Sequence, residues 1–197
     1  MIRNNFFLLL IILIISSCVD KRDLSQNTVI AHILSQPDGL HPFNDNSAMR
    51  SFVFEYTQKT LLKLDLESLE YIPLLSKSLP TISEDGLRYT FELRDDVYWD
   101  DGSKLTVDDV VFTTKIMLCP LTNNAQIRSN YNTVIKSIET YEDDPLKFTM
   151  HAHNINYNNK TIYSGLYIQQ AKYWDPKGII KNLSFEQINA KKFKETE

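Results

Sequence analysis

The longest apolar run of the chain lies at its amino terminus. Ten consecutive apolar residues, 6–15, follow a single positive charge at Arg3, and small residues then lead to Cys18. Ten residues are too few to cross a bilayer core, which needs about 20 residues of helix. A short basic start, a short apolar centre and small residues before a cleavage site are typical of an export signal. We therefore expect residues 1–17 to be a signal peptide.

Two apolar patterns follow before residue 60. β-branched and apolar residues predict a strand over 28–34, and the Pro and Gly after it predict a turn at 36–39. Apolar residues at helical spacing then predict a helix over 47–59, with Ser47 as its N-cap.

The clearest patterns lie in the middle of the chain. Strict alternation over 87–94 predicts a strand with one apolar face, and an Asp-Gly pair after it predicts a turn. Thr106 and Asp109 have the spacing of a capping box, in which each side chain accepts a hydrogen bond from the other residue's backbone N–H. Apolar residues at helical spacing continue this helix to Leu118.

The last third of the chain predicts further strands and a helix. Paired strands are expected over 133–140 and 146–152, around an acidic turn with a proline. After residue 154 the chain is rich in Asn and Tyr, and the pattern indicates a helix over 158–166 and a short strand over 167–171. No internal repeat is visible, so a solenoid is not expected.

Composition narrows the classes of function. Without the first 17 residues and their Arg3, the chain holds 20 Lys and Arg against 25 Asp and Glu. A net charge of −5 offers no basic stripe for nucleic acid. Apolar residues make up 43% of the chain and aromatic residues 11%, which is enough to build a core.

The end of the signal resembles the lipobox of bacterial lipoproteins, which are cut before the cysteine and lipidated on it. This resemblance implies a lipid on Cys18, with residues 18–27 as a polar tether and the protein exported and lipid-anchored at the cell envelope, in the periplasm. The alternative is a signal peptide with an incidental cysteine. With Cys18 lipidated, Cys119 has no disulfide partner in the chain, and we expect it to be a small buried hydrophobe.

A series of motifs carries a second resemblance. In order, they are a DG turn and a YTF strand (85–97), a second DG turn (99–102) and a T-x-x-DVVF helix start (105–112), preceded by 74–79. The series resembles the extracytoplasmic solute-binding proteins of peptide and dipeptide ABC importers. Residues 40–42 match the L-x-P of that family after its first strand, and the resemblance spans about 28–175. Asp96 departs from it, because the family often has glycine there.

The resemblance implies a mixed α/β, periplasmic-binding-protein-like fold with two lobes. Family members run to several hundred residues, so we expect only the amino-terminal lobe here, and the chain to be a fragment or a decayed gene product. Within that lobe, 28–46 and 151–197 would form one part and 47–150 an inserted subdomain. Such a protein captures peptides outside the cytoplasmic membrane and delivers them to ABC permease subunits, as a monomer and without a cofactor or a metal.

The same resemblance places ligand contacts at two positions. Backbone leaving the first strand pairs with the bound peptide in the family, and the matching residues are Ser35, Gln36 and Pro37. Gln36 offers no charge, whereas some relatives carry an acid there. Phe112 matches an aromatic residue of the peptide cleft. The alternatives are an ordinary strand exit for 35–37 and a core position for Phe112.

Other candidate chemistry has simpler explanations. His151 and His153 share one face of a strand and could bind a metal, but a solvated strand end explains them without one. Three Asp doublets could serve acid–base catalysis, yet each also suits a turn or a helix cap. No nucleophile elbow or phosphate loop is visible, so we expect no enzyme. A secreted lipoprotein hydrolase and a non-functional fragment remain the alternatives to a binding protein.

Overall fold

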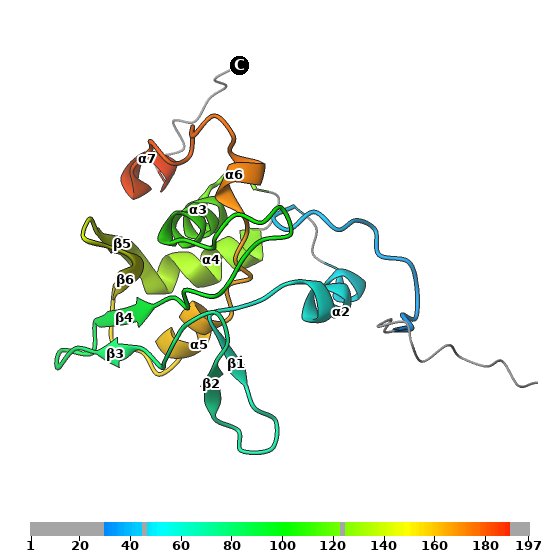
Figure 1. Ribbon diagram of the computed structural model, residues 1–197, viewed down its shortest axis with the longest axis horizontal. Coiled ribbons are helices and arrows are strands. Elements are labelled where there is room, and N and C mark those ends of the chain that lie inside the picture. The colour runs from blue at the N-terminus through cyan, green and yellow to red at the C-terminus, as the bar shows by residue number, and fades with distance from the viewer. Residues whose placement is uncertain (1–29, 45–46, 123–124, 190–197) are drawn as a thin grey trace, which may run out of the picture. The chain divides into compact units, whose positions relative to one another are not determined.

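The computed structural model describes residues 30–44, 47–122 and 125–189 (Figure 1). The signal peptide, Cys18 and the tether predicted above lie outside these residues. The helices and strands are, in chain order, α2 (Ala48–Thr57), β1 (Leu62–Leu64), β2 (Tyr71–Pro73), β3 (Thr81–Ile82), β4 (Arg88–Glu92), α3 (Val107–Leu118), α4 (Ala125–Val134), β5 (Ile135–Tyr141), β6 (Asp144–Ala152), α5 (Asn159–Ser164), α6 (Ala171–Trp174) and α7 (Phe185–Asn189).

A four-stranded antiparallel sheet forms the centre of the fold, in the order β3-β4-β6-β5. Tyr89 and Phe91 on β4, and Phe148 and Met150 on β6, are buried on the inner strands. Phe91 and Phe148 are partners in the register, and their rings stack with centroids 5.4 Å apart. The alternating pattern over 87–94 therefore predicts the buried face of β4 correctly, because residues two apart on a strand share one face.

The strands predicted over 87–94, 133–140 and 146–152 are confirmed as β4, β5 and β6. β5 starts two residues later than predicted because α4 continues to Val134. That helix was not predicted, since its sequence is polar and rich in Asn. Its apolar residues nevertheless follow helical spacing, and Tyr131 and Val134 pack against the core.

Helix α3 begins where the capping box predicts. Thr106 is the N-cap, and its backbone N–H donates to the carboxylate of Asp109 at 2.9 Å. Val110 and Leu118 pack into the core below, with 0% and 1% of their surface exposed. Helices α3 and α4 lie beside each other over the sheet in Figure 1. Cys119 ends α3 and is buried, as predicted.

The helix predicted over 47–59 is confirmed as α2, and the Ser47 hydroxyl accepts a hydrogen bond from the Arg50 N–H at 3.1 Å. The helix predicted over 158–166 is confirmed as the shorter α5. The turns predicted at the two Asp-Gly pairs are also present. Gly86 and Gly102 adopt φ values of 66° and 78°, which glycine tolerates without a Cβ clash.

Three predictions are wrong. Residues 30–34 form no strand, because no other described strand pairs with them and apolar side chains alone do not make a ladder. The chain bends at 38 without a hydrogen-bonded turn. The strand predicted over 167–171 is reduced to one bridge between Tyr167 and Thr60, since α6 begins at Ala171.

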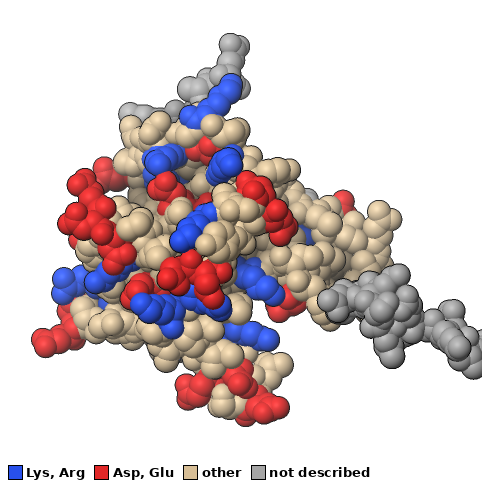
Figure 2. Space-filling view, viewed as in Figure 1, with Lys and Arg blue, Asp and Glu red and all other residues tan. Residues whose placement is uncertain are grey.

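A hairpin of β1 and β2 projects from the rest of the described fold (Figure 1). Its tip, residues 65–70, carries acidic residues and the exposed Leu66 and Leu69. On the face drawn in Figure 2, basic and acidic side chains are interleaved, and acidic ones gather at this tip. Among the residues that the structure describes, no helix is long and apolar enough to span a membrane.

Candidate functional site

The predicted ligand-contact segment, residues 35–37, lies at the surface of the protein. Ser35 and Gln36 are exposed and Pro37 is half-buried. Within the described part of the chain, no hydrogen bond joins residues 34–40 to any other residue. Their backbone N–H and C=O groups are thus available to a partner, which is the state that strand addition by a peptide requires.

The next residues of the chain are held in place. Arg50 of α2 is only 6% exposed, and its guanidinium donates to the carbonyl of Pro42 at 2.9 Å and to that of His41 at 3.3 Å. The His41 ring in turn accepts a hydrogen bond from the Phe43 N–H at 3.1 Å. Sequence reasoning missed Arg50, because an arginine within a helix carries no signal of what its side chain contacts.

Phe112 lies in an aromatic cluster that crosses three segments of the chain. The aromatic cluster consists of His41, Phe43, Phe112, Tyr173 and Trp174. Phe112 is 3% exposed, and Phe43 covers it edge-on with ring centroids 6.0 Å apart. Trp174 contacts both His41 and Phe43, with centroids 5.2 Å and 5.9 Å away. The structure therefore brings Phe112 close to residues 41–43, and does not join it directly to 35–37.

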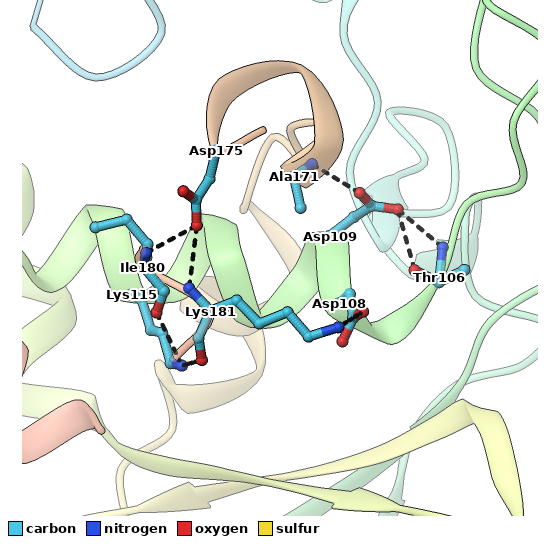
Figure 3. Close-up of polar contacts among 8 residues, drawn as sticks. All are labelled: Thr106, Asp108, Asp109, Lys115, Ala171, Asp175, Ile180 and Lys181. Carbon is cyan, nitrogen blue, oxygen red and sulfur yellow. Dashed lines mark hydrogen bonds and ion pairs between the residues drawn. The ribbon is translucent and has the colours of Figure 1, made fainter. Parts of the chain in front are cut away.

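Asp109 connects α3 with two other segments. One carboxylate oxygen accepts from the Thr106 N–H at 2.9 Å and from the Trp99 indole N–H at 3.2 Å. The other accepts from the Ala171 N–H, the first residue of α6, at 2.8 Å (Figure 3). Burial raises the pKa of Asp109, although these donors oppose the shift. The capping box predicted Asp109 as a local cap, but its bonds to Trp99 and α6 are visible only in the tertiary structure.

The segment after α6 contacts both the first and the last turn of α3. The Asp175 carboxylate accepts from the Ile180 N–H at 2.8 Å and from the Lys181 N–H at 3.1 Å (Figure 3). Lys115 reaches from α3 and donates to the carbonyls of both residues, while Lys181 forms an ion pair with Asp108 at 2.7 Å. Burial lowers the pKa of Lys115, because the charged ammonium is removed from water.

A hollow of about 340 Å³ lies between the start of α3 and this segment. Its lining includes Trp99, Asp108, Phe112, Gln170, Asp175 and Lys181. Acidic and basic side chains both border it, so its charge favours neither an anion nor a cation.

The other candidate groups have local partners. His151 contacts Glu139 at 3.0 Å on the neighbouring strand, and His153 is exposed. Within residues 30–44, 47–122 and 125–189 no three side chains are placed to bind a metal. Asp96 pairs with Arg94, and Asp101 accepts hydrogen bonds from Ser103 in the second Asp-Gly turn. These carboxylates serve turns and ion pairs, as their sequence positions suggest.

Comparison with known proteins identifies the family of this fold. The model of the bacterial extracellular solute-binding proteins, family 5 Middle, matches residues 70–194. Protein XP55 of Streptomyces lividans is 36% identical over 98 residues, which cover 49% of this chain and 17% of XP55. The oligopeptide-binding protein OppA of Bacillus subtilis is 29% identical over 100 residues, which cover 51% of this chain and 18% of OppA.

A solved structure is similar to this chain in both sequence and fold. NikZ from Campylobacter jejuni, crystallised in complex with Ni(L-His), is 28% identical and superposes with a TM-score of 0.58. The match covers 78% of this chain and 29% of NikZ. The mixed α/β fold expected from the sequence is therefore confirmed as the fold of periplasmic binding proteins. The chain spans under a fifth of the curated relatives it matches and under a third of NikZ.

Proposed function

The chain belongs to the bacterial extracellular solute-binding proteins of family 5, and from this premise we propose that it captures peptides for an ABC importer. The family match over residues 70–194 carries the proposal. Capture takes place outside the cytoplasmic membrane, without a catalytic step, and the loaded protein delivers its peptide to the permease subunits. The division into an inserted subdomain at 47–150 and flanking parts, and a monomeric state, stay predictions.

The open segment 34–40 suits this function. A peptide that adds as a strand obtains its affinity from main-chain hydrogen bonds, which do not depend on its sequence. Ser35 and Gln36 are exposed and their backbone groups have no partner among the described residues. The peptide therefore needs no existing bond of the protein to be broken before it binds.

Peptide binding is testable by isothermal titration with an equimolar mixture of di- to pentapeptides. We expect heat of binding, and mass spectrometry of the retained fraction should recover intact peptides. Gln36→Pro removes one backbone donor and should weaken binding about fivefold to tenfold, because a hydrogen bond contributes roughly 1 kcal/mol net. Gln36→Ala keeps that donor and serves as the matched control.

Four results of this titration would contradict a part of the proposal. Binding that Gln36→Pro and Gln36→Ala weaken equally would exclude main-chain pairing at this position. Recovery of cleaved peptides would favour the hydrolase alternative. No heat with peptides, but heat with the Ni(L-His) complex, would replace peptide by a metal chelate as the captured ligand. Binding of neither ligand would overturn the proposal in favour of the non-functional fragment.

We also propose that Cys18 anchors the protein to the membrane through a lipid. A ten-residue apolar run that ends at small residues before this cysteine supports the proposal. Cells that express the chain in the presence of radiolabelled palmitate should yield labelled protein in the membrane fraction. Cys18→Ser should lose the label, whereas Cys119→Ser, the matched control, should keep it. A label that survives Cys18→Ser would contradict lipidation at this residue.

A further inference from the structure

Trp174 contacts residues 41–43, the segment that follows the ligand-contact residues 35–37. Its ring contacts His41 and Phe43, at centroid distances of 5.2 Å and 5.9 Å, and the contact with Phe43 has the edge-to-face geometry that aromatic pairs favour. The side chain is 38% exposed and belongs to a helix of four residues. So short and exposed an element contributes little to the central core, and its contacts with 41–43 call for another explanation.

Helix α3 supports both sides of this contact. Phe112, one turn after Asp109, contacts Phe43 edge-on with ring centroids 6.0 Å apart. Asp109 accepts the hydrogen bond from the N–H of Ala171, which begins α6. These contacts form a closed path that begins and ends on α3. Asp109 of α3 bonds to the start of α6, Trp174 of α6 packs on Phe43, and Phe43 packs on Phe112 of α3. This closed path fixes Trp174 and Phe43 relative to one helix.

Residues 34–40, which precede 41–43 in the chain, form no hydrogen bond with another described residue. Residues 34–40 are attached to the described fold through the chain that continues into 41–43. Pairing with a peptide requires strands about 4.8 Å apart in a defined register. Residues 41–43 hold one end of this segment, so a firmer hold on them reduces the backbone entropy that residues 35–37 lose on binding.

We infer that Trp174 is a positioning residue for the ligand-contact segment Ser35–Pro37, acting through His41 and Phe43. The inference rests on the proposed function and deepens it, since it adds a device that prepares the binding segment before the peptide arrives. Asp109 supports Trp174 through the start of α6, and Arg50 of α2 donates to the carbonyls of His41 and Pro42.

Peptide affinity separates this role from a purely structural one. Trp174→Ala is expected to weaken binding of the di- to pentapeptide mixture about tenfold, since two aromatic contacts are lost. Trp174→Phe retains a ring and should restore most of the affinity. Tyr157→Ala, which removes an aromatic ring that is 90% exposed and lies outside the aromatic cluster, is the control and should bind like the unaltered chain. Urea unfolding of each variant checks that the affinity losses are not losses of folded protein.

Tryptophan emission gives a spectroscopic readout, because the chain has only Trp99 and Trp174. Peptide binding should change the emission of the unaltered chain, and this change should disappear in Trp174→Phe although that variant still binds. A change that persists in Trp174→Phe arises from Trp99 and would overturn the inference. Equal affinity of Trp174→Ala and the unaltered chain would overturn it as well.

Amide hydrogen exchange tests the same role without a ligand. The N–H groups of Phe43 and Asn44 donate to the His41 ring, and they should exchange faster in Trp174→Ala than in Tyr157→Ala. Unchanged exchange would show that Trp174 does not hold this segment. Because this readout needs no peptide, failure of the inference is distinguishable from failure of the proposed function, which shows as an unaltered chain that binds nothing.

Discussion

Replacement of Asp109 by alanine is expected to lower the free energy of unfolding by about 3 kcal/mol, because three partly buried donors then lose their acceptor. The N–H groups of Thr106 and Ala171 and the indole of Trp99 all donate to this carboxylate, which is 5% exposed. Urea denaturation followed by circular dichroism measures the loss.

Asp108 provides the matched control for this substitution. It precedes Asp109 in the same helical turn but is exposed, and it pairs with Lys181 at the surface. Asp108→Ala should cost at most about 1 kcal/mol, the usual range for exposed ion pairs. Equal losses for the two variants would mean that the charge at the start of α3 matters, and that the bonds to Trp99 and α6 do not.

Phe148→Ala should cost about 3–5 kcal/mol, because it leaves a cavity in the core that covers the buried face of the sheet. Phe148 is completely buried and stacks on Phe91 at 5.4 Å. The same urea titration measures the change, and the midpoint should fall without a change in slope if the variant still unfolds in one step.

Phe52→Ala on α2 deletes the same side chain at a position that is 40% exposed. Its cost should be roughly 1 kcal/mol, since most of the ring already contacts water or the neighbouring Tyr56. A loss for Phe148→Ala as small as that for Phe52→Ala would contradict a core centred on β4 and β6.

Local chemistry explains which elements could be predicted. The alternation around Tyr89 and Phe91, the capping pair Thr106 and Asp109, and the glycine at 102 each encode their geometry within a few residues. The strand predicted over 28–34 is wrong for the opposite reason. A strand exists only if another strand completes its hydrogen bonds, and no apolar pattern within one segment states where that partner lies.

The candidate site depends on contacts between distant segments. The resemblance of the motifs to a known family placed Ser35, Gln36, Pro37 and Phe112 at a ligand, and these placements stay predictions. Sequence reasoning gave no reason to connect Phe112 with residues 41–43, or Asp109 with α6. Sixty-two positions separate Asp109 from Ala171, and only the folded chain brings them to 2.8 Å.

The sequence by itself determined the family and the central elements, because motifs, helix caps and strand alternation are properties of neighbouring residues. It also determined the apolar run before Cys18, from which export and lipidation are proposed. Only the tertiary structure decided that 30–34 is no strand, that Asp109 bonds to α6 and that Trp174 packs on His41 and Phe43. These contacts join segments that are far apart in the sequence. Their distance in space depends on how the whole core packs, and the sequence of one segment does not contain that information.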